Sequence, residues 1–140
     1  MITRYAAAAI EVDAAPREVF ELVTDWPRHH EWMFMTTAEQ VAADRIEAYT
    51  GIRPFGFLDP MTITRWEPPH VVVMAHTGSL VRGDGAIRVR ERPGGSRVIW
   101  AERLLIPVWA APLWPVAHEV SVALARHSLR RLAALLNRPL

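Results

Sequence analysis

The sequence predicts a single α+β domain, residues 1–140, in which a run of antiparallel strands is followed by one long helix. Three observations support this prediction. The chain opens with a strand-like segment and two short helical segments, its middle breaks into short alternating runs between turn residues, and its last third has helical periodicity. At 140 residues and 51% hydrophobic composition, the chain is long enough to bury a core as one domain.

The opening segment accounts for the two short helices. Thr3–Val12 has the pattern of a strand, and Pro16 suits the first position of a helix, because its missing N–H has no helical partner there. Helical spacing places four apolar side chains on one face of this helix: Val19, Phe20, Leu22 and Val23. Asp25 can cap a second short helix, so we expect Trp26 and Trp32 to pack toward an apolar interior.

The middle of the chain, residues 35–107, shows no persistent helical stripe. Its strand-like runs are Ile46–Ile52, Leu58–Trp66, Val71–Thr77, Leu80–Val81 leading into Ala86–Arg92, and Arg97–Ile106. We interpret GDG at 83–85 and RPGG at 92–95 as turns, because glycine permits the backbone angles of tight turns and bulges. The last two runs form the strongest hairpin pattern in the chain.

The last third of the chain predicts one helix, which begins near Pro112–Pro115 and ends at about Leu136. Eight side chains share its apolar face: Leu113, Ala117, Val120, Ser121, Leu124, Ser128, Leu132 and Leu135. Part of this face is small, with Ala117, Ser121, Ala125 and Ser128. Small side chains there indicate either close packing against a strand or the wall of a ligand cavity.

The composition argues against several classes of function. A formal net charge of +1 gives no strong field for nucleic acid or an anionic membrane surface, so we expect no nucleic-acid partner. Without cysteine, the chain has no disulfide framework, zinc knuckle or thiol nucleophile. All 16 basic residues are arginine, which together with the abundant alanine is typical of a GC-rich, bacterial coding bias.

The chain is expected to be a soluble, cytoplasmic protein. Its first residues, 1–12, alternate like a strand and do not resemble a signal peptide. No run approaches the roughly 20 apolar residues that a membrane-spanning helix needs, so we expect no integral membrane association. The longest apolar tract, residues 104–117, contains three prolines.

The segment IEVDAAPREVFELVTDWPRHHEWM, residues 10–33, resembles the opening of the START/SRPBCC superfamily, which includes the polyketide cyclase/dehydrase and lipid-transport group. WEPPH at 66–70, GGSRVIWAERL at 94–104 and the terminal helix support the resemblance. It implies a helix-grip fold, a curved antiparallel sheet wrapped around the C-terminal helix and an elongated apolar cavity. Residues 34–45 depart from the family pattern, because they are shorter and richer in alanine than its second and third strands.

Strand alternation makes Trp100 and Glu102 candidates for the cavity. Arg97 and Arg103 share the other face of the strand and belong in water, so Trp100 and Glu102 should point inward. The resemblance implies the same, since aromatic polyketide cyclases carry a similar Trp-x-polar pair facing the pocket. An inward carboxylate needs a raised pKa or a partner such as arginine. The alternative is a structural Glu102 that reaches solvent at the strand end or pairs with an arginine.

Arg65 and His76 are the other two candidate catalytic residues. If Thr62, Thr64 and Trp66 face outward, then Met61, Ile63 and Arg65 face the cavity, where cyclases of the family use an arginine to hold substrate oxygens. The alternation leaves the opposite orientation open, because this one places Trp66 outside. His76 lies in the strand VVVMAHT and is suited to act as a pocket acid or base. A core or rim histidine without a catalytic role is the alternative for His76.

The predicted ligand site combines these residues with aromatic and small side chains. Its residues are Trp32, Phe34, Arg65, His76, Trp100, Glu102, Trp109, Ala117, Ser121 and Leu124. Trp109 and Trp114 suit a lid over the cavity or a homodimer contact. The chain has no HExxH or phosphate-binding glycine loop, so we expect no metal and no cofactor.

Three functions are compatible with these residues. The first is binding of a hydrophobic small molecule, aromatic, polyketide-like or lipid, in an internal cavity. The second is a cofactor-independent cyclase or aromatase, in which Arg65, Glu102 and His76 orient and polarise a poly-β-ketone. The third is a protein-interaction module without a ligand, which a filled core and an exposed apolar patch around Trp109 and Trp114 would favour.

Overall fold

The computed structural model of the chain describes residues 1–137. Its elements, in chain order, are β1 (Ile2–Val12), α1 (Pro16–Val23), the 3₁₀ helix η1 (Trp26–Glu31), β2 (Thr36–Ala42), β3 (Arg45–Ile52), β4 (Phe55–Glu67), β5 (Val71–Thr77), β6 (Arg82–Arg92), β7 (Gly95–Ile106), the 3₁₀ helix η2 (Val108–Leu113) and α2 (Trp114–Leu136). The predicted α+β class, with two short helices after the first strand and a long terminal helix, is confirmed.

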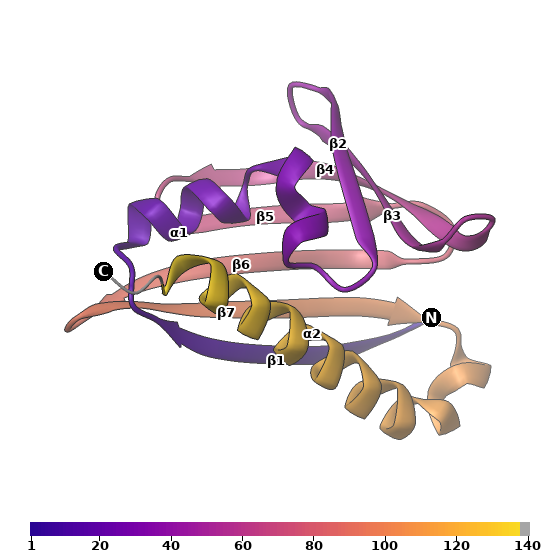
Figure 1. Ribbon diagram of the computed structural model, residues 1–140. Helices are drawn as coiled ribbons and strands as arrows, with labels where there is room; N and C mark the ends of the chain where they lie inside the picture. The colour runs from indigo at the N-terminus through magenta and orange to yellow at the C-terminus, as the bar shows by residue number, and fades with distance from the viewer. Residues whose placement is uncertain (138–140) are drawn as a thin grey trace.

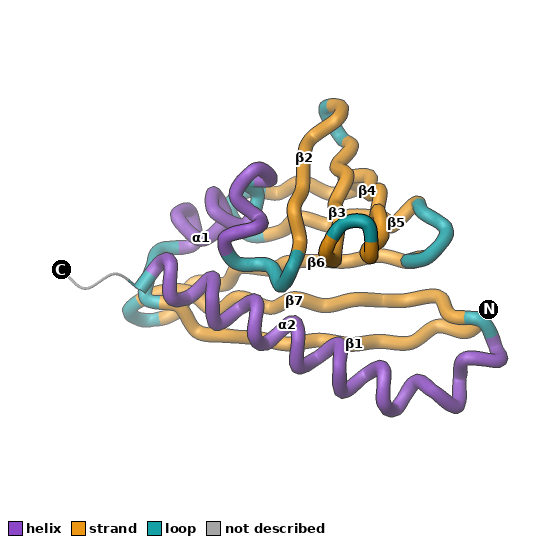
Figure 2. Tube along the Cα trace, turned by 45° about the vertical axis from the view of Figure 1, so that its right-hand side comes forward, coloured by secondary structure: helices purple, strands orange, loops and turns teal. Residues whose placement is uncertain are grey.

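The seven strands form one sheet in the order β1-β7-β6-β5-β4-β3-β2. Every pair of neighbouring strands is antiparallel. The sheet is strongly curved, and β2 and β3 rise away from the direction of β1 and β7 (Figure 2). The result is the helix-grip arrangement that the sequence resemblance implies.

The helices cover the concave face of this sheet (Figure 1). α1 packs against β6 and β7, η1 packs against β2, and α2 runs along β1. The side chains between these layers form a single core. Its fully buried apolar members are Val12, Val19, Val23, Trp32, Ile46, Val72, Val89, Val98, Leu129 and Leu132.

The two halves of α2 have different surroundings. The second half is anchored, because Ser128, Leu129 and Leu132 are buried against the core. The expected burial is wrong for Val120 in the first half and for Leu113, which belongs to η2 rather than to α2; both side chains are exposed. Helical periodicity identifies one side of a helix, but it does not show where along the helix the sheet ends.

Two features of the strands differ from the sequence-based expectation. Residues 83–85, GDG, do not form a turn but belong to β6. Thr36–Ala42 forms an edge strand, β2, that was not predicted, with a bulge between Gln40 and Ala42. The alternation of β2 is weak because most of its side chains are exposed.

Candidate functional site

A cavity of two adjacent chambers, which share lining residues, lies against the sheet, and α2 lines the outer one. The outer chamber has a volume of about 260 Å³ and is lined by Ala6, Ala7, Met33, Phe34, Thr36, Thr50, Asp59, His76, Val81, Trp100, Glu102, Leu104, Ser121, Val122, Leu124, Ala125 and Ser128. The inner chamber has a volume of about 90 Å³ and adds His29, Ala48, Met61, Met74, Gly85, Ala86 and Ile87. Most of these side chains are apolar, so the cavity suits a hydrophobic molecule.

The two chambers share a network of four polar side chains. The Nδ1 atom of His76 lies 3.0 Å from both carboxylate oxygens of Asp59, and its Nε2 atom lies 3.0 Å from Oε2 of Glu102. The indole N–H of Trp100 donates to Oε1 of Glu102 at 3.0 Å. The side chains of His76, Asp59 and Glu102 are 7%, 14% and 22% exposed. Three ionisable groups therefore meet where the chambers join.

Gly85 of β6 makes this network sterically feasible. His76 is on β5 and Glu102 on β7, so the bridge between them must pass over β6. Gly85 pairs directly with Glu102 in the sheet. A Cβ atom at position 85 would lie 2.8 Å from Oε1 and 2.9 Å from Oε2 of Glu102. Any side chain at this position would displace the carboxylate from its present place.

The network changes the protonation of His76. Burial alone would lower the pKa of its imidazole, but the hydrogen bonds and negative charges of Asp59 and Glu102 outweigh burial and raise the pKa to about 10. At neutral pH, the ring is therefore an imidazolium that donates from both nitrogens. His29 lines only the inner chamber. The pKa of its imidazole shifts in the opposite direction, because burial lowers it.

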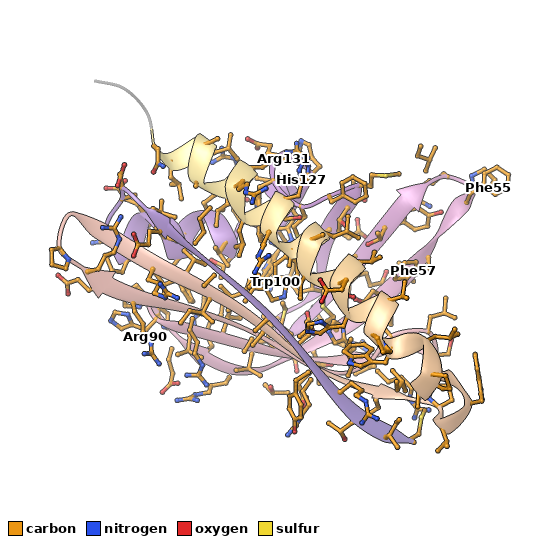
Figure 3. The ribbon with its side chains drawn as sticks, turned by 90° about the horizontal axis from the view of Figure 1, so that it is seen from below. Phe55, Phe57, Arg90, Trp100, His127 and Arg131 are labelled. Carbon is orange, nitrogen blue, oxygen red and sulfur yellow. The ribbon has the colours of Figure 1, made fainter. Side chains whose placement is uncertain are left out.

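Six of the ten sequence-predicted ligand residues line the cavity in the part of the chain that the structure describes: Phe34, His76, Trp100, Glu102, Ser121 and Leu124. Trp100 lies between the strands and α2, whereas Arg90 projects from the opposite side of the sheet (Figure 3). Ala125 and Ser128 also line the cavity, so these small side chains of α2 form a cavity wall.

Arg65 does not line the cavity, and the expected inward orientation of its side chain is wrong. A bulge between Ile63 and Arg65 shifts the pairing of β4 with β5 by one residue. Beyond the bulge, Trp66 packs edge-on against Phe20 of α1, with ring centroids 5.2 Å apart. Arg65 therefore has the opposite orientation, and it forms an ion pair with Glu67 at the surface.

The other three predicted residues also lie outside the cavity lining. Trp32 is completely buried. Its ring packs edge-on against the cavity residue Trp100, with the ring centroids 6.2 Å apart. Trp109 of η2 is 76% exposed, and Ala117 is exposed on the first half of α2. Both belong to the segment that extends beyond the core, and neither of them lines a chamber.

Asp59 is the site residue that sequence reasoning missed. It lies two positions before Met61 on the same strand, and Met61 was expected to point inward. Because residues two apart on a strand share a face, alternation indicates that Asp59 also points inward. Pro60, which lies between Asp59 and Met61, instead suggests that the strand ends there. Gly85 was also missed, because the GDG sequence resembles a turn.

Residues 1–137 lack two features that would indicate other classes of protein. In this range, no helix is both long and apolar enough to span a membrane. No group of three or more His, Cys, Asp or Glu side chains in the same range is arranged to hold a metal ion. In the cavity network, both nitrogens of His76 are already bonded to carboxylates.

Comparison with known families decides the classification. Residues 5–137 match the family described as polyketide cyclase / dehydrase and lipid transport. The chain belongs to this family. The match covers both the sheet and α2, and so includes all the residues of the cavity network. A comparison with curated proteins finds no significant match.

Solved structures share the fold of this polyketide cyclase/dehydrase and lipid-transport family member at low sequence identity. A START superfamily protein from Mycobacterium smegmatis has 9% identity and a TM-score of 0.77, covering 94% of this chain and 96% of its own. A conserved protein from Geobacillus kaustophilus has 13% identity and a TM-score of 0.78, covering 95% of both chains. The di-domain ARO/CYC StfQ from the steffimycin biosynthetic pathway has 12% identity and a TM-score of 0.77, covering 96% of this chain and 51% of its own.

The raised pKa of His76 predicts how stability changes with pH. Between pH 6.5 and about 10, the folded protein retains a proton on His76 that the unfolded chain releases, so the free energy of unfolding should fall as pH rises. Urea unfolding of the wild type and of His76→Gln across this range measures the effect. The wild type should lose stability relative to the variant as pH increases, and parallel profiles would contradict the network.

The tight approach at position 85 predicts the effect of Gly85→Ala. The new methyl group should push the Glu102 carboxylate away from His76, so the pKa of His76 should fall while the fold survives. Titration of the His76 ring by NMR measures this change. In a Glu102→Ala background the same substitution should leave the His76 pKa unchanged. An unaltered pKa in the single variant would show that Glu102 can keep its bond to His76 despite the added methyl group.

Proposed function

We propose that this chain binds a hydrophobic small molecule, of aromatic, polyketide-like or lipid character, in the two-chamber cavity. The observation that carries the proposal is a largely apolar cavity with a partly buried set of paired ionisable groups where its two chambers meet. The apolar walls would hold the body of the ligand, and the network would hold its polar group. The family description, which includes lipid transport, supports this function.

The high pKa of His76 favours binding over proton-transfer catalysis. A general acid or base works best when its pKa lies near the working pH. With a pKa of about 10, the His76 imidazolium gives up its proton reluctantly at neutral pH. A fixed imidazolium between two carboxylates is better suited to orienting a ligand than to exchanging protons with it. The chain contains no cysteine, and all 16 of its lysine or arginine positions are arginine. Both properties support a bacterial, cytoplasmic setting for this binding.

A cofactor-independent cyclase or aromatase is the second candidate function. The observation that favours it is Glu102, a carboxylate with 22% side-chain exposure in a largely apolar cavity, because such a group can accept a proton from a β-ketone carbon. The structural similarity to the di-domain ARO/CYC StfQ supports the same candidate. Arg65 has no part in this version of the mechanism, since it lies outside the cavity.

An interaction module without a ligand has less support. The exposed apolar side chains of η2 and the first half of α2, including Trp109, Leu113 and Val116, suit a contact with a second copy of the chain. However, that function gives no role to an open cavity or to the buried network. We therefore treat this surface as secondary to ligand binding.

Binding can be tested with N-phenyl-1-naphthylamine, an uncharged apolar fluorophore. The wild type should bind it, and Ala125→Trp should weaken binding by at least about tenfold because the indole occupies the outer chamber. Ala123→Trp, two positions away on the exposed side of α2, is the matched control and should bind normally. Ser121→Phe provides a second obstruction if Ala125→Trp fails to fold. Equal binding by the obstructed and control variants would contradict the proposed site.

The cyclase candidate makes a separate prediction. A linear poly-β-ketone thioester incubated with the wild type should give cyclised product above the spontaneous level, detected by mass spectrometry. Glu102→Gln should abolish this excess, whereas Arg65→Ala should retain it, because Arg65 is at the surface. Wild-type product at the spontaneous level would exclude this candidate for the substrate used and leave ligand binding intact.

A further inference from the structure

The charges that line the cavity do not balance. Among the described residues around the two chambers, the charged side chains are Asp59, His76 and Glu102, and no arginine is present. Two carboxylates and one imidazolium leave a net charge of −1. If His76 lost its proton, the balance would become more negative still. The net charge of the cavity lining is therefore negative whether or not His76 is protonated.

The network also has more hydrogen-bond acceptors than donors. Glu102 accepts one bond on each oxygen, from His76 and Trp100. The two oxygens of Asp59 share a single ring N–H of His76. A carboxylate can accept about four hydrogen bonds, so both groups retain free lone pairs. In contrast, the three N–H groups of His76 and Trp100 are all engaged.

The opposite wall adds few donors. The hydroxyl of Thr36 donates to the carbonyl oxygen of Phe34 at 2.8 Å. In its 3.0 Å contact with Thr50, Thr36 must therefore be the acceptor, and the hydrogen of Thr50 is also used. The remaining neutral donors among the described lining residues are the hydroxyls of Ser121 and Ser128 on α2. A carboxylate or phosphate group entering this cavity would meet no free cationic donor among the lining residues within 1–137.

From this imbalance we propose that the ligand is a hydrophobic amine, whose protonated nitrogen lies against the free oxygens of Asp59 and Glu102. The proposal rests on the ligand-binding function above and specifies the chemistry of the ligand at the same site. An ammonium group supplies three donors and one positive charge. The described cavity lining has too few hydrogen-bond donors and too little positive charge, and an ammonium group supplies both.

The energetics of covering the network favour the same ligand class. A bound ligand removes solvent from Asp59 and Glu102, and a net negative charge is costly to bury without a counter-charge. An ammonium group offsets this cost, a hydroxyl offsets it only in part, and a carboxylate increases it. Trp100 lines both chambers, and an indole face also attracts cations. The expected order of affinity is therefore amine, alcohol, carboxylate.

Displacement of N-phenyl-1-naphthylamine by octylamine, 1-octanol and octanoic acid at neutral pH tests this order. The three competitors share an apolar chain and differ in the charge of the head group. Octylamine should displace the fluorophore at a concentration at least about tenfold lower than octanoic acid, with 1-octanol between them. Glu102→Gln should remove most of the difference between amine and alcohol. Asp59→Asn serves as an independent second variant if Glu102→Gln fails to fold.

Glu39→Gln is the matched control, because it changes the net charge of the protein equally at an exposed position on β2. It should keep the wild-type order. Equal displacement by octylamine and octanoic acid, no displacement by any competitor, or an unchanged order in Glu102→Gln would each overturn the amine assignment. In all three cases fluorophore binding itself would still support the proposed function. Absence of fluorophore binding by the wild type would instead count against the proposed function.

Discussion

The contact of His76 with two carboxylates is the interaction on which the rest of the site depends. Each member of this group would be costly to bury alone, because a buried charge needs a partner and filled hydrogen bonds. Together, Asp59, His76 and Glu102 give one another partners across strands β4, β5 and β7, and only the two carboxylates keep free lone pairs. The network also fixes the indole of Trp100, and it places the polar groups where the two chambers meet.

The fold and part of the site could be predicted from the sequence because they depend on strong local signals. Pro16 and the apolar stripe that follows it mark the first helix, and the structure has α1 at Pro16–Val23. The inward side of β7 could be assigned because Arg97 and Arg103 occupy its other face. Trp100 and Glu102 line the cavity, so simple alternation located the most informative part of the site.

The remaining features depend on pairing between strands, which a single sequence does not encode locally. The bulge before Arg65 reverses the alternation of β4, and only the register with β5 shows it. Gly85 resembles a turn residue until Glu102 is placed opposite it. Asp59 has no functional meaning before His76 is brought within hydrogen-bond distance. In each case, the missing information is the identity of the neighbour across the sheet.

The close approach of the Glu102 carboxylate to Gly85 has a consequence for how this site can be inherited. A glycine opposite a carboxylate is a linked pair, since a larger residue at 85 leaves no room for an acid at 102 in its present orientation. Homologous chains with both residues would be able to conserve the charged bridge, whereas chains with only one would have had to abandon it. Two positions seventeen residues apart along the chain, 85 and 102, are therefore constrained together: the charged bridge needs a glycine at the first and an acid at the second.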